Sequence, residues 1–403
     1  MIGKDAARWI ALATVLLSGC AATRSYPAPP LQPSASLIEA DVAAASQSRP
    51  WPTSGGTATR VPRNVLVLSG GGMCGAYTVG VLSGWSAAGT RPCFDIVTGV
   101  STGALIAPFA FLGQEYDAEL ERIYTSTRQG NVVCPRLLWL DSLASSEPLE
   151  KQIATSATPE VLRQIAAAHR EGRRLYVGTT NLDTKSLVVW DLGAIAARNT
   201  QESQDLFRKV LLASCSIPGL LPPVPIDIEV DGKRFTELHV DGGVTACVFL
   251  QPAMLGIGPR GELPSTGDRS TIHVVVAGKL EQTYVPARRQ LLSIASESAS
   301  TVLQAKLEGE LGQLFSLARY VNADFRLAGI PQDYTIAGTN MSFDPRVMRG
   351  LFDEGWRGGK SGTVWQSIPP RLAREIAAKP RRDTRFVAVH DEPSQSPGHA
   401  ERF

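Results

Sequence analysis

The chain has 403 residues, of which 43% are apolar, so it can form one large domain or two ordinary ones around a substantial core. Its formal net charge is only +2 and no basic block stands out. This balance gives no electrostatic support for a nucleic-acid partner.

The first residues have the pattern of a secretory signal. Basic residues precede an apolar run over residues 9–17, which is too short to span a bilayer. The run leads into "LSGC", which resembles the lipobox of bacterial lipoproteins, where cleavage precedes a cysteine that is then acylated. We therefore expect a signal peptide over residues 1–19 and a lipid anchor on Cys20. An ordinary signal peptide with a coincidental cysteine is the alternative. Ala21, where an aspartate would suggest inner-membrane retention, favours the outer membrane of a Gram-negative cell envelope.

Residues 20–62 are rich in Ala, Ser, Thr and Pro without a periodic apolar pattern, which is typical of a flexible tether. From Asn64 onwards, short apolar runs alternate with helical patterns. The pattern predicts strands over residues 64–70, 94–100, 173–182, 186–192, 235–243 and 271–278. It predicts helices over residues 76–89, 102–113, 115–127, 203–215, 345–359 and 371–379, and one long helix or two over residues 289–321. The alternation predicts an α/β domain over residues 63–380, with a mostly parallel central sheet flanked by helices. Residues 381–403 are polar and predict a disordered tail.

A glycine-rich loop, "SGGGMCG", follows the first predicted strand. Gly70, Gly72 and Gly75 satisfy the dinucleotide-binding pattern G-x-G-x-x-G. That pattern needs an acidic residue at the end of the next strand, whereas Asp95 stands at its start, and no Gly-Lys-Ser/Thr of a P-loop follows. The loop is therefore better interpreted as a set of backbone N–H donors for an oxyanion than as a nucleotide site.

The second predicted strand ends in "GVSTG", a G-x-S-x-G motif placed between a strand and a helix. There the two glycines permit a tight turn that exposes the Ser101 hydroxyl, and the helix N-terminus favours developing negative charge. The carboxyl ends of neighbouring parallel strands meet at one edge of a sheet. We therefore expect Ser101 to be a nucleophile close to the glycine loop.

The base for this serine is better marked by an aspartate than by a histidine. Asp241 follows a predicted strand and precedes two glycines, which allow another backbone or the serine to approach the carboxylate closely. His273 would fit a Ser-Asp-His order but has no motif around it. His239 lies two residues before Asp241 and therefore on the same side of the strand. We interpret it as a hydrogen-bonded wall residue, with a role in orienting Asp241 as the alternative.

The cysteines other than Cys20 give no zinc signature, since no C-x-x-C pair occurs. They are Cys74, Cys93, Cys134, Cys215 and Cys247. In an oxidising compartment a Cys93–Cys134 bridge is one possibility, and buried free thiols are the other.

Four motifs in order, "SGGGMCGAYTVGVL", "GVSTGA", "ASCSIPGLLPPV" and "VDGG", resemble the patatin-like phospholipase family. The resemblance covers roughly residues 64–359. It implies a three-layer α/β fold and hydrolysis of lipid acyl esters by a Ser–Asp dyad without histidine, metal or cofactor. Carried over to this sequence, Ser101 is the nucleophile, Asp241 the base, and Gly70, Gly71 and Gly72 the oxyanion hole. Cys74 stands where the family commonly has Arg or Lys, so it supplies no cation for a phosphate headgroup.

The resemblance implies a phospholipase A or lysophospholipase-like enzyme with a membrane lipid as substrate, and neither nucleotide nor nucleic acid as a partner. Two alternatives stay open. The chain could be a lipid-binding lipoprotein without turnover, or an acyltransferase that uses the same acyl-enzyme with a different acceptor. The apolar stretch over residues 217–226 could cover an acyl channel or form a rigid core loop.

Overall fold

The computed structural model describes residues 25–28, 62–132, 134–135, 142–230, 232–258, 260–263, 269–282 and 289–378. The expected signal peptide, Cys20, most of the tether and the tail over residues 381–403 lie outside these residues.

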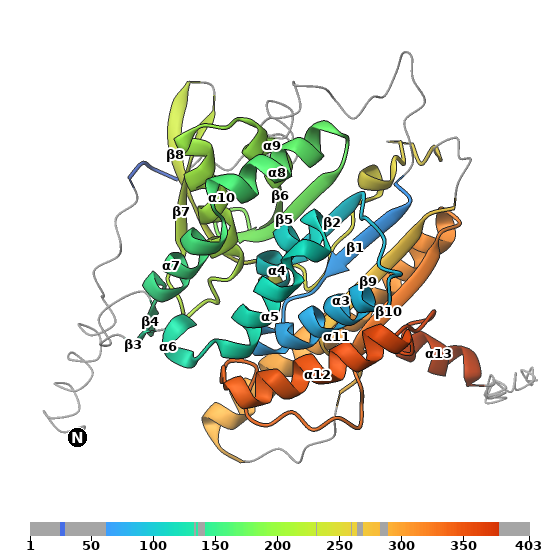
Figure 1. Cartoon of the computed structure of the whole chain (residues 1–403). Coiled ribbons are helices and arrows are strands. Elements are labelled where there is room, and N and C mark those ends of the chain that lie inside the picture. The colour runs from blue at the N-terminus through green and yellow to red at the C-terminus, as the bar shows by residue number, and fades with distance from the viewer. Residues whose placement is uncertain are drawn as a thin grey trace, which may run out of the picture.

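Within the described residues, one sheet contains eight strands, and they lie in the order β10-β9-β1-β2-β5-β8-β7, with β6 also paired to β5 (Figure 1). The strands are β1 (Asn64–Leu68), β2 (Ile96–Val100), β5 (Arg174–Asn181), β6 (Ser186–Asp191), β7 (Val224–Val230), β8 (Lys233–Asp241), β9 (Thr271–Lys279) and β10 (Asp324–Ile330). The pairs from β10 through β5 are parallel, and those of β6, β7 and β8 are antiparallel. A small separate ladder pairs β3 (Cys134–Pro135) with β4 (Ala144–Ser145). The mostly parallel α/β sheet expected from the sequence is confirmed.

Helices cover both faces of this sheet and make it the middle of three layers (Figure 1). The helices are α3 (Gly75–Ala87), α4 (Thr102–Leu112), α5 (Asp117–Ser126), α6 (Gln129–Val132), α7 (Glu147–Ser156), α8 (Pro159–Arg170), α9 (Leu192–Ala197), α10 (Gln201–Ser214), α11 (Leu291–Tyr320), α12 (Pro345–Ser361) and α13 (Pro370–Ala377). Short 3₁₀ turns span Gly72–Cys74, Gln114–Tyr116, Gly242–Val244 and Pro252–Leu255.

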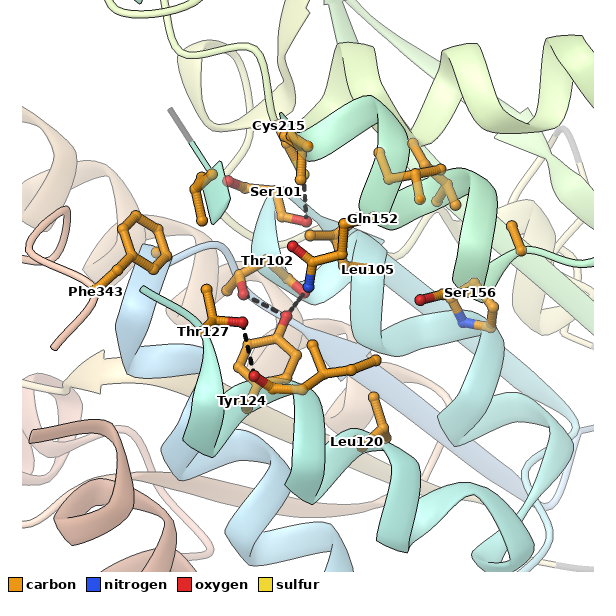
Figure 2. Close-up of a pocket in the computed structure, with 18 of the residues that line it drawn as sticks. Ser101, Thr102, Leu105, Leu120, Tyr124, Thr127, Gln152, Ser156, Cys215 and Phe343 are labelled. Carbon is orange, nitrogen blue, oxygen red and sulfur yellow. Dashed lines mark hydrogen bonds between the residues drawn. The ribbon is translucent and has the colours of Figure 1, made fainter. Parts of the chain in front are cut away.

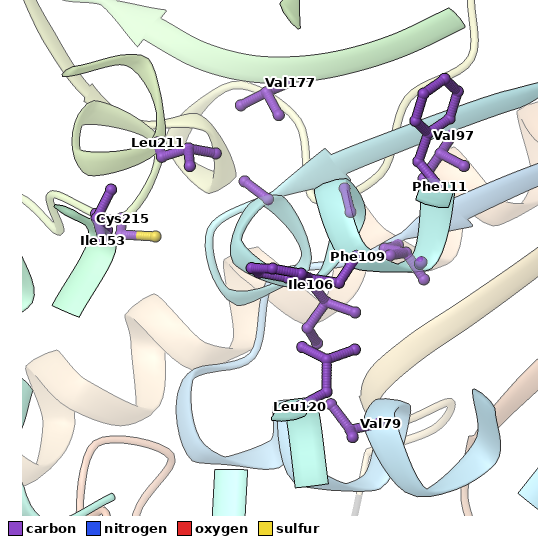
Figure 3. Packing of buried hydrophobic residues seen from close by; sticks show 14 of the residues in the cluster. Val79, Val97, Ile106, Phe109, Phe111, Leu120, Ile153, Val177, Leu211 and Cys215 are labelled. Atoms are coloured by element: carbon purple, nitrogen blue, oxygen red, sulfur yellow. The ribbon is translucent and has the colours of Figure 1, made fainter. Parts of the chain in front are cut away.

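The alternation of side chains along β1 divides the core into two parts. Leu66 and Leu68 belong to the cluster beneath α3, α4, α10 and α12, whereas Val65 and Val67 belong to the cluster beneath α11. Both faces of the strand are therefore buried, as expected for a parallel sheet between helices. Figure 3 shows the first cluster around α4, where Ile106 is fully buried. Full burial of such a side chain contributes roughly 1.5–3 kcal/mol.

Helix α12 packs unusually close to α3, because glycines replace side chains at the contact. A Cβ atom at Gly80 would lie 2.1 Å from the carbonyl oxygen of Phe352, and one at Gly355 would lie 2.3 Å from that of Tyr77. This contact holds the segment just before α12 against the loop that precedes α3. As a result, the Met73 N–H donates to the Asn340 carbonyl at 2.8 Å.

Candidate active site

Ser101 occupies a strained turn between β2 and α4. Its φ of 54° and ψ of −126° lie outside the regions that non-glycine residues favour. The turn is possible because Gly99 and Gly103 lack side chains. A Cβ atom at Gly99 would lie 2.5 Å from the Gly103 carbonyl oxygen, and one at Gly103 would lie 2.6 Å from the Leu68 carbonyl oxygen. The strain holds the serine at the start of α4, which is the geometry of a nucleophile elbow.

The backbone of Ser101 is fixed by the end of α10. The Ser101 N–H donates to Ser214 Oγ at 3.0 Å, and the Ser214 hydroxyl donates in turn to the Gly178 carbonyl at 2.7 Å. The Cys215 thiol donates to the Ser101 carbonyl at 3.2 Å. Because these contacts satisfy the main chain, the turn keeps its conformation and the Ser101 side chain is left for chemistry.

Asp241 reaches Ser101 across a single intervening strand. Residue Val100 of β2 is in register with Gly178 of β5, and Thr179 of β5 is in register with Asp241 of β8. Val100, the last strand residue before Ser101, and Asp241 therefore lie on opposite sides of β5, beside two consecutive residues of that strand. The Ser101 side chain is close enough to lower the pKa of the Asp241 carboxyl.

The end of β8 can lie this close to β5 and β2 because the residues that follow Asp241 are glycines. A Cβ atom at Gly242 would lie 2.4 Å from the Gly178 carbonyl oxygen and 3.0 Å from a methyl of Val100. The Gly243 N–H donates to Asp241 Oδ1 at 2.7 Å. The two glycines after the aspartate thus allow the close approach expected from the sequence.

Burial dominates the electrostatics of Asp241. Desolvation raises the pKa of its carboxyl from 3.8 to about 6, although the hydrogen bonds from Ser101 and Gly243 and the charge of Lys306 lower it. A carboxylate with a pKa near 6 is still mostly ionised at neutral pH and is a stronger base than an exposed aspartate. The geometry and the basicity therefore suit proton transfer from the serine hydroxyl.

The glycine loop lies beside the serine. A Cβ atom at Gly70 would be 3.0 Å from the Ser101 Cβ atom. Gly71 passes so close to Ala277 that a Cβ atom would lie 2.0 Å from that residue's carbonyl oxygen, and Gly72 has a φ of 57°. Among the described residues, no acceptor is recorded for the N–H groups of these three glycines. They are therefore available as donors to a bound oxygen.

Cys74 faces away from solvent behind this loop. Its thiol is fully buried and contacts Asn340 Oδ1 at 3.5 Å. Burial raises the pKa of this thiol to about 12, so it is neutral at physiological pH. The position that the family commonly gives to a cation thus contributes no charge here.

A deep apolar pocket opens beside Ser101 (Figure 2). It encloses about 950 Å³ of space not filled by atoms, open solvent at its mouth included. Side chains from α4, α5, α7, α8 and α10 form most of its wall: Leu105, Phe109, Leu120, Ile123, Leu149, Ile153, Val161 and Leu211. Ile217 and Leu221 also line it. The first part of the apolar stretch over residues 217–226 therefore borders the pocket, and Val224 begins β7.

The side chains of His239 and His273 contact residues other than Ser101 and Asp241. His239 is fully buried, with Nδ1 3.0 Å from Thr179 Oγ1 and Nε2 3.0 Å from Glu237 Oε2, so both ring nitrogens are occupied by residues other than Asp241. His273 packs against Trp85, with ring centroids 4.9 Å apart, and burial lowers its pKa to about 4. The interpretation of His239 as a wall residue agrees with these contacts.

Two other expectations from the sequence can be compared with the structure. Of the two possibilities left open for the cysteines, the Cys93–Cys134 bridge is not formed in this structure, where Cys93 is an exposed free thiol. Cys74 and Cys215 are buried thiols. Asp95 accepts the N–H groups of Arg63 and Asn64 at the opposite end of the strands, which explains an acidic residue there without a nucleotide.

Within the described part of the chain, no group of three or more His, Cys, Asp or Glu side chains could hold a metal ion. Over the same residues, no helix is both long and apolar enough to cross a membrane.

Comparison with known proteins agrees with this geometry. Residues 66–254 match the family model described as Patatin-like phospholipase. The chain contains a patatin-like phospholipase domain. The match supports a hydrolase of lipid esters, and the matched residues include Ser101, Asp241 and the glycine loop.

Individual relatives are more distant. A cUMP-AMP-activated phospholipase of Escherichia coli is 47% identical over 64 residues, which are 15% of this chain and 20% of that protein. The patatin-like chain thus matches about a fifth of the length of that relative. Among solved structures, VipD from Legionella pneumophila is 12% identical with a TM-score of 0.32, over 77% of this chain and 68% of that one. The type III effector protein ExoU is 12% identical with a TM-score of 0.35, over 78% and 58%. Likenesses this distant carry no argument about the site.

Proposed function

We propose that this patatin-like chain is a serine hydrolase of lipid carboxylic esters, of the phospholipase A or lysophospholipase type. The observation that supports it best is that Ser101, which lines the apolar pocket, lies close enough to the buried Asp241 to lower the pKa of its carboxyl. A nucleophile, a base of raised pKa and an apolar cavity are the parts that acyl-ester cleavage needs.

In the proposed reaction, Asp241 accepts the Oγ proton of Ser101 as the oxygen attacks the ester carbonyl. The carbonyl electrons move onto the oxygen, and the N–H groups of Gly70, Gly71 and Gly72 stabilise that oxyanion. The oxyanion collapses, and the leaving alcohol takes the proton from Asp241. A water molecule then attacks the acyl-enzyme by the same sequence and releases the fatty acid.

The pocket provides the chemical basis for a lipid substrate. Its wall is largely apolar, so an acyl chain that enters it leaves water and gains roughly 0.8 kcal/mol per buried methylene. The neutral Cys74 thiol adds no attraction for a phosphate at the loop. We therefore expect the acyl chain, rather than a charged headgroup at that position, to contribute most of the binding energy.

The proposal is tested with the full chain carrying Cys20→Ser, which prevents acylation. The wild-type sequence in that background is expected to hydrolyse p-nitrophenyl butyrate, and Ser101→Ala is expected to abolish turnover. Ser361→Ala, an exposed serine on α12, is the matched control and should retain full activity. Equal turnover by Ser101→Ala would contradict the assignment.

The product distinguishes the alternatives. Native membrane lipids are incubated with wild type and with Ser101→Ala, and the lipids are analysed by mass spectrometry. Free fatty acid that depends on Ser101 supports hydrolysis, and an acyl group moved to another lipid identifies a transferase. Lipid recovered unchanged in stoichiometric amounts would indicate binding without turnover.

We also propose that acylated Cys20 anchors the chain in the cell envelope, at the outer membrane of a Gram-negative bacterium. The proposal is supported by the lipobox-like "LSGC" and by the absence of an aspartate after the cysteine. Cys20→Ser is expected to move the protein from the membrane fraction to the soluble fraction. Unchanged retention in the membrane would argue against the anchor.

A further inference from the structure

We propose that Lys306 of α11 is a positioning residue for the general base of the proposed reaction. Together with Glu310, one helical turn further on, it holds the turn that follows Asp241 and so fixes the carboxylate beside Ser101. This inference rests on the proposed function, because it assigns a role at that same site. Lys306 lies outside residues 66–254, so the match to the family model does not cover it.

The ammonium group of Lys306 binds the backbone of the 3₁₀ turn Gly242–Val244. Its Nζ donates to the carbonyl oxygen of Val244 at 2.9 Å and to that of Gly243 at 3.2 Å. In the same turn, the Gly243 N–H donates to Asp241 Oδ1 at 2.7 Å. The turn therefore binds the lysine through its carbonyl groups and the carboxylate through an amide, so the position of one affects the other.

Glu310 holds the next part of the same segment. Its Oε2 accepts the N–H of Cys247 at 2.8 Å and that of Val248 at 3.1 Å. Glu310 and Lys306 are four positions apart and therefore share one face of α11, with Lys306 Nζ 4.0 Å from Glu310 Oε1. The side chain of Lys306 is 24% exposed and that of Glu310 is 15% exposed. A mostly buried cation thus binds carbonyl groups and a mostly buried anion binds amide groups of one short segment, as buried polar groups require.

Both sides of this arrangement are fixed to the rest of the domain. On α11, Leu307 is buried in the cluster beneath the helix, which holds the neighbouring Lys306 in place. At the far end of the segment, Thr98 Oγ1 donates to the Phe249 carbonyl at 2.9 Å. Thr98 belongs to β2, the strand that leads to the nucleophile. The residues after Asp241 are therefore held between α11 and the strand that carries the serine.

Lys306 also supplies the positive charge that acts on the Asp241 carboxyl. That charge lowers the pKa of the carboxyl, against the larger effect of burial. The thiols of Cys215 and Cys247 also interact with Asp241. Burial and then the charge of Asp241 raise the pKa of Cys215, whereas burial and then the charge of Glu310 raise that of Cys247 to about 12, so both thiols are neutral. Without the ammonium group, burial would be less opposed and the carboxyl would keep its proton to a higher pH.

The experiment compares three substitutions in the full chain carrying Cys20→Ser. Lys306→Arg keeps the charge and a donor, Lys306→Gln keeps a donor without the charge, and Lys306→Met keeps neither. Lys209→Met, at an exposed position on α10, is the matched control. For each variant, kcat and KM for p-nitrophenyl butyrate are measured as a function of pH, and circular dichroism confirms that the variant is folded.

The pH dependence of kcat/KM reports the pKa of the base in the free enzyme. We expect its acid limb to move to higher pH in Lys306→Gln and Lys306→Met, and to stay where it is in wild type for Lys306→Arg and Lys209→Met. A residue that only stabilised the fold would not move this limb.

The loss at high pH separates positioning from charge. There Asp241 is ionised in every variant, yet Lys306→Met should still lose about tenfold in kcat because the turn is less well held, which is a smaller loss than the roughly 100-fold or more that removal of a general base causes. KM should be unchanged, because Lys306 is not part of the pocket wall. If Lys306→Met does not fold, the comparison of Lys306→Gln with Lys306→Arg decides the question.

Three results would overturn the inference while leaving the proposed function intact. They are an acid limb that Lys306→Gln and Lys306→Met leave at the wild-type pH, an equal shift in Lys209→Met, and a loss that falls on KM with kcat unchanged. Absence of Ser101-dependent turnover in wild type would instead refute the proposed function, and this inference with it.

Discussion

Replacement of Asp241 by Asn should stabilise the protein by an amount that grows with pH. The physical reason is that the folded state holds this carboxylate in a buried position, which raises its pKa from 3.8 to about 6. Below pH 3.8 the carboxyl is protonated in both the folded and the unfolded state, so burial of the side chain has no ionic cost. As the pH rises through 6, the folded protein must hold a charge that the unfolded chain exposes to water, and stability is lost.

The size of the effect follows from the two pKa values. One pKa unit corresponds to 1.36 kcal/mol, so the cost reaches about 3 kcal/mol at pH 8 and about half that at pH 5. Asp241→Asn removes this cost and keeps the shape of the side chain. The gain in the free energy of unfolding relative to wild type should therefore increase by roughly 1.4 kcal/mol between pH 5 and pH 8.

Urea unfolding followed by circular dichroism at several pH values measures this difference. The comparison across pH is decisive because any constant loss, such as a weaker hydrogen bond to Ser101 or Gly243, cancels. Asp333→Asn, at an exposed position, is the control for the loss of a carboxylate that is not buried. A flat or falling curve for Asp241→Asn would show that the carboxylate is not desolvated in the folded protein.

Three further predictions concern activity. The value of kcat/KM should rise with pH and level off above an apparent pKa of about 6, because Asp241 must be ionised to accept a proton; activity undiminished at pH 4 would exclude it as the base. Gly71→Ala should reduce kcat at least about 100-fold, since its Cβ atom would lie 2.0 Å from a backbone oxygen, whereas Gly130→Ala meets nothing within 4 Å and should be neutral. Ile153→Trp should fill the pocket and lower kcat/KM for p-nitrophenyl palmitate at least about tenfold, with little change for the butyrate; an equal loss for both esters would mean that the residue does not limit chain length.

The site residues that could be predicted from the sequence are those whose local backbone geometry requires neighbouring glycines. Ser101 lies between two glycines because its turn requires them, and Asp241 precedes two glycines because Gly242 must pass close to Gly178. Each need leaves a short motif at a fixed spacing. The strands before the glycine loop and before Ser101 were also predicted, because β1 and β2 are buried parallel strands, which give short apolar runs.

The residues that hold Ser101, the glycine loop and Asp241 in place could not be predicted from such short motifs. Asn340 receives the Met73 N–H and Lys306 acts on Asp241, each across a long sequence separation and through an ordinary residue type. Ser214, which accepts the Ser101 N–H, belongs to the motif "ASCSIPGLLPPV", but the motif does not indicate that contact. No periodicity in one sequence indicates such a contact. The pairing of Cys93 with Cys134 stayed open for a related reason, since spacing along the chain says nothing about the distance between two cysteines in the fold.

Some secondary structure was missed because its pattern is weak. Strands β7 and β10 alternate apolar with charged residues over a few positions, and α9 has only six residues. Helix α7 contributes Leu149 and Ile153 to the pocket, yet its sequence is mostly polar and carries little apolar signal. The wall of the pocket was therefore less predictable than its catalytic entrance.

The machinery of this site is divided among distant stretches of the polypeptide. The glycine loop follows β1, the nucleophile follows β2, the carboxylate ends β8, and the carbonyl that braces the loop belongs to Asn340. A nascent or translocating chain, still extended, carries only an ordinary hydroxyl and an ordinary acid. Under the proposed function, such a chain does not hydrolyse the lipids of the bilayer through which it is exported. Hydrolytic activity arises only when the last of these segments has folded into place.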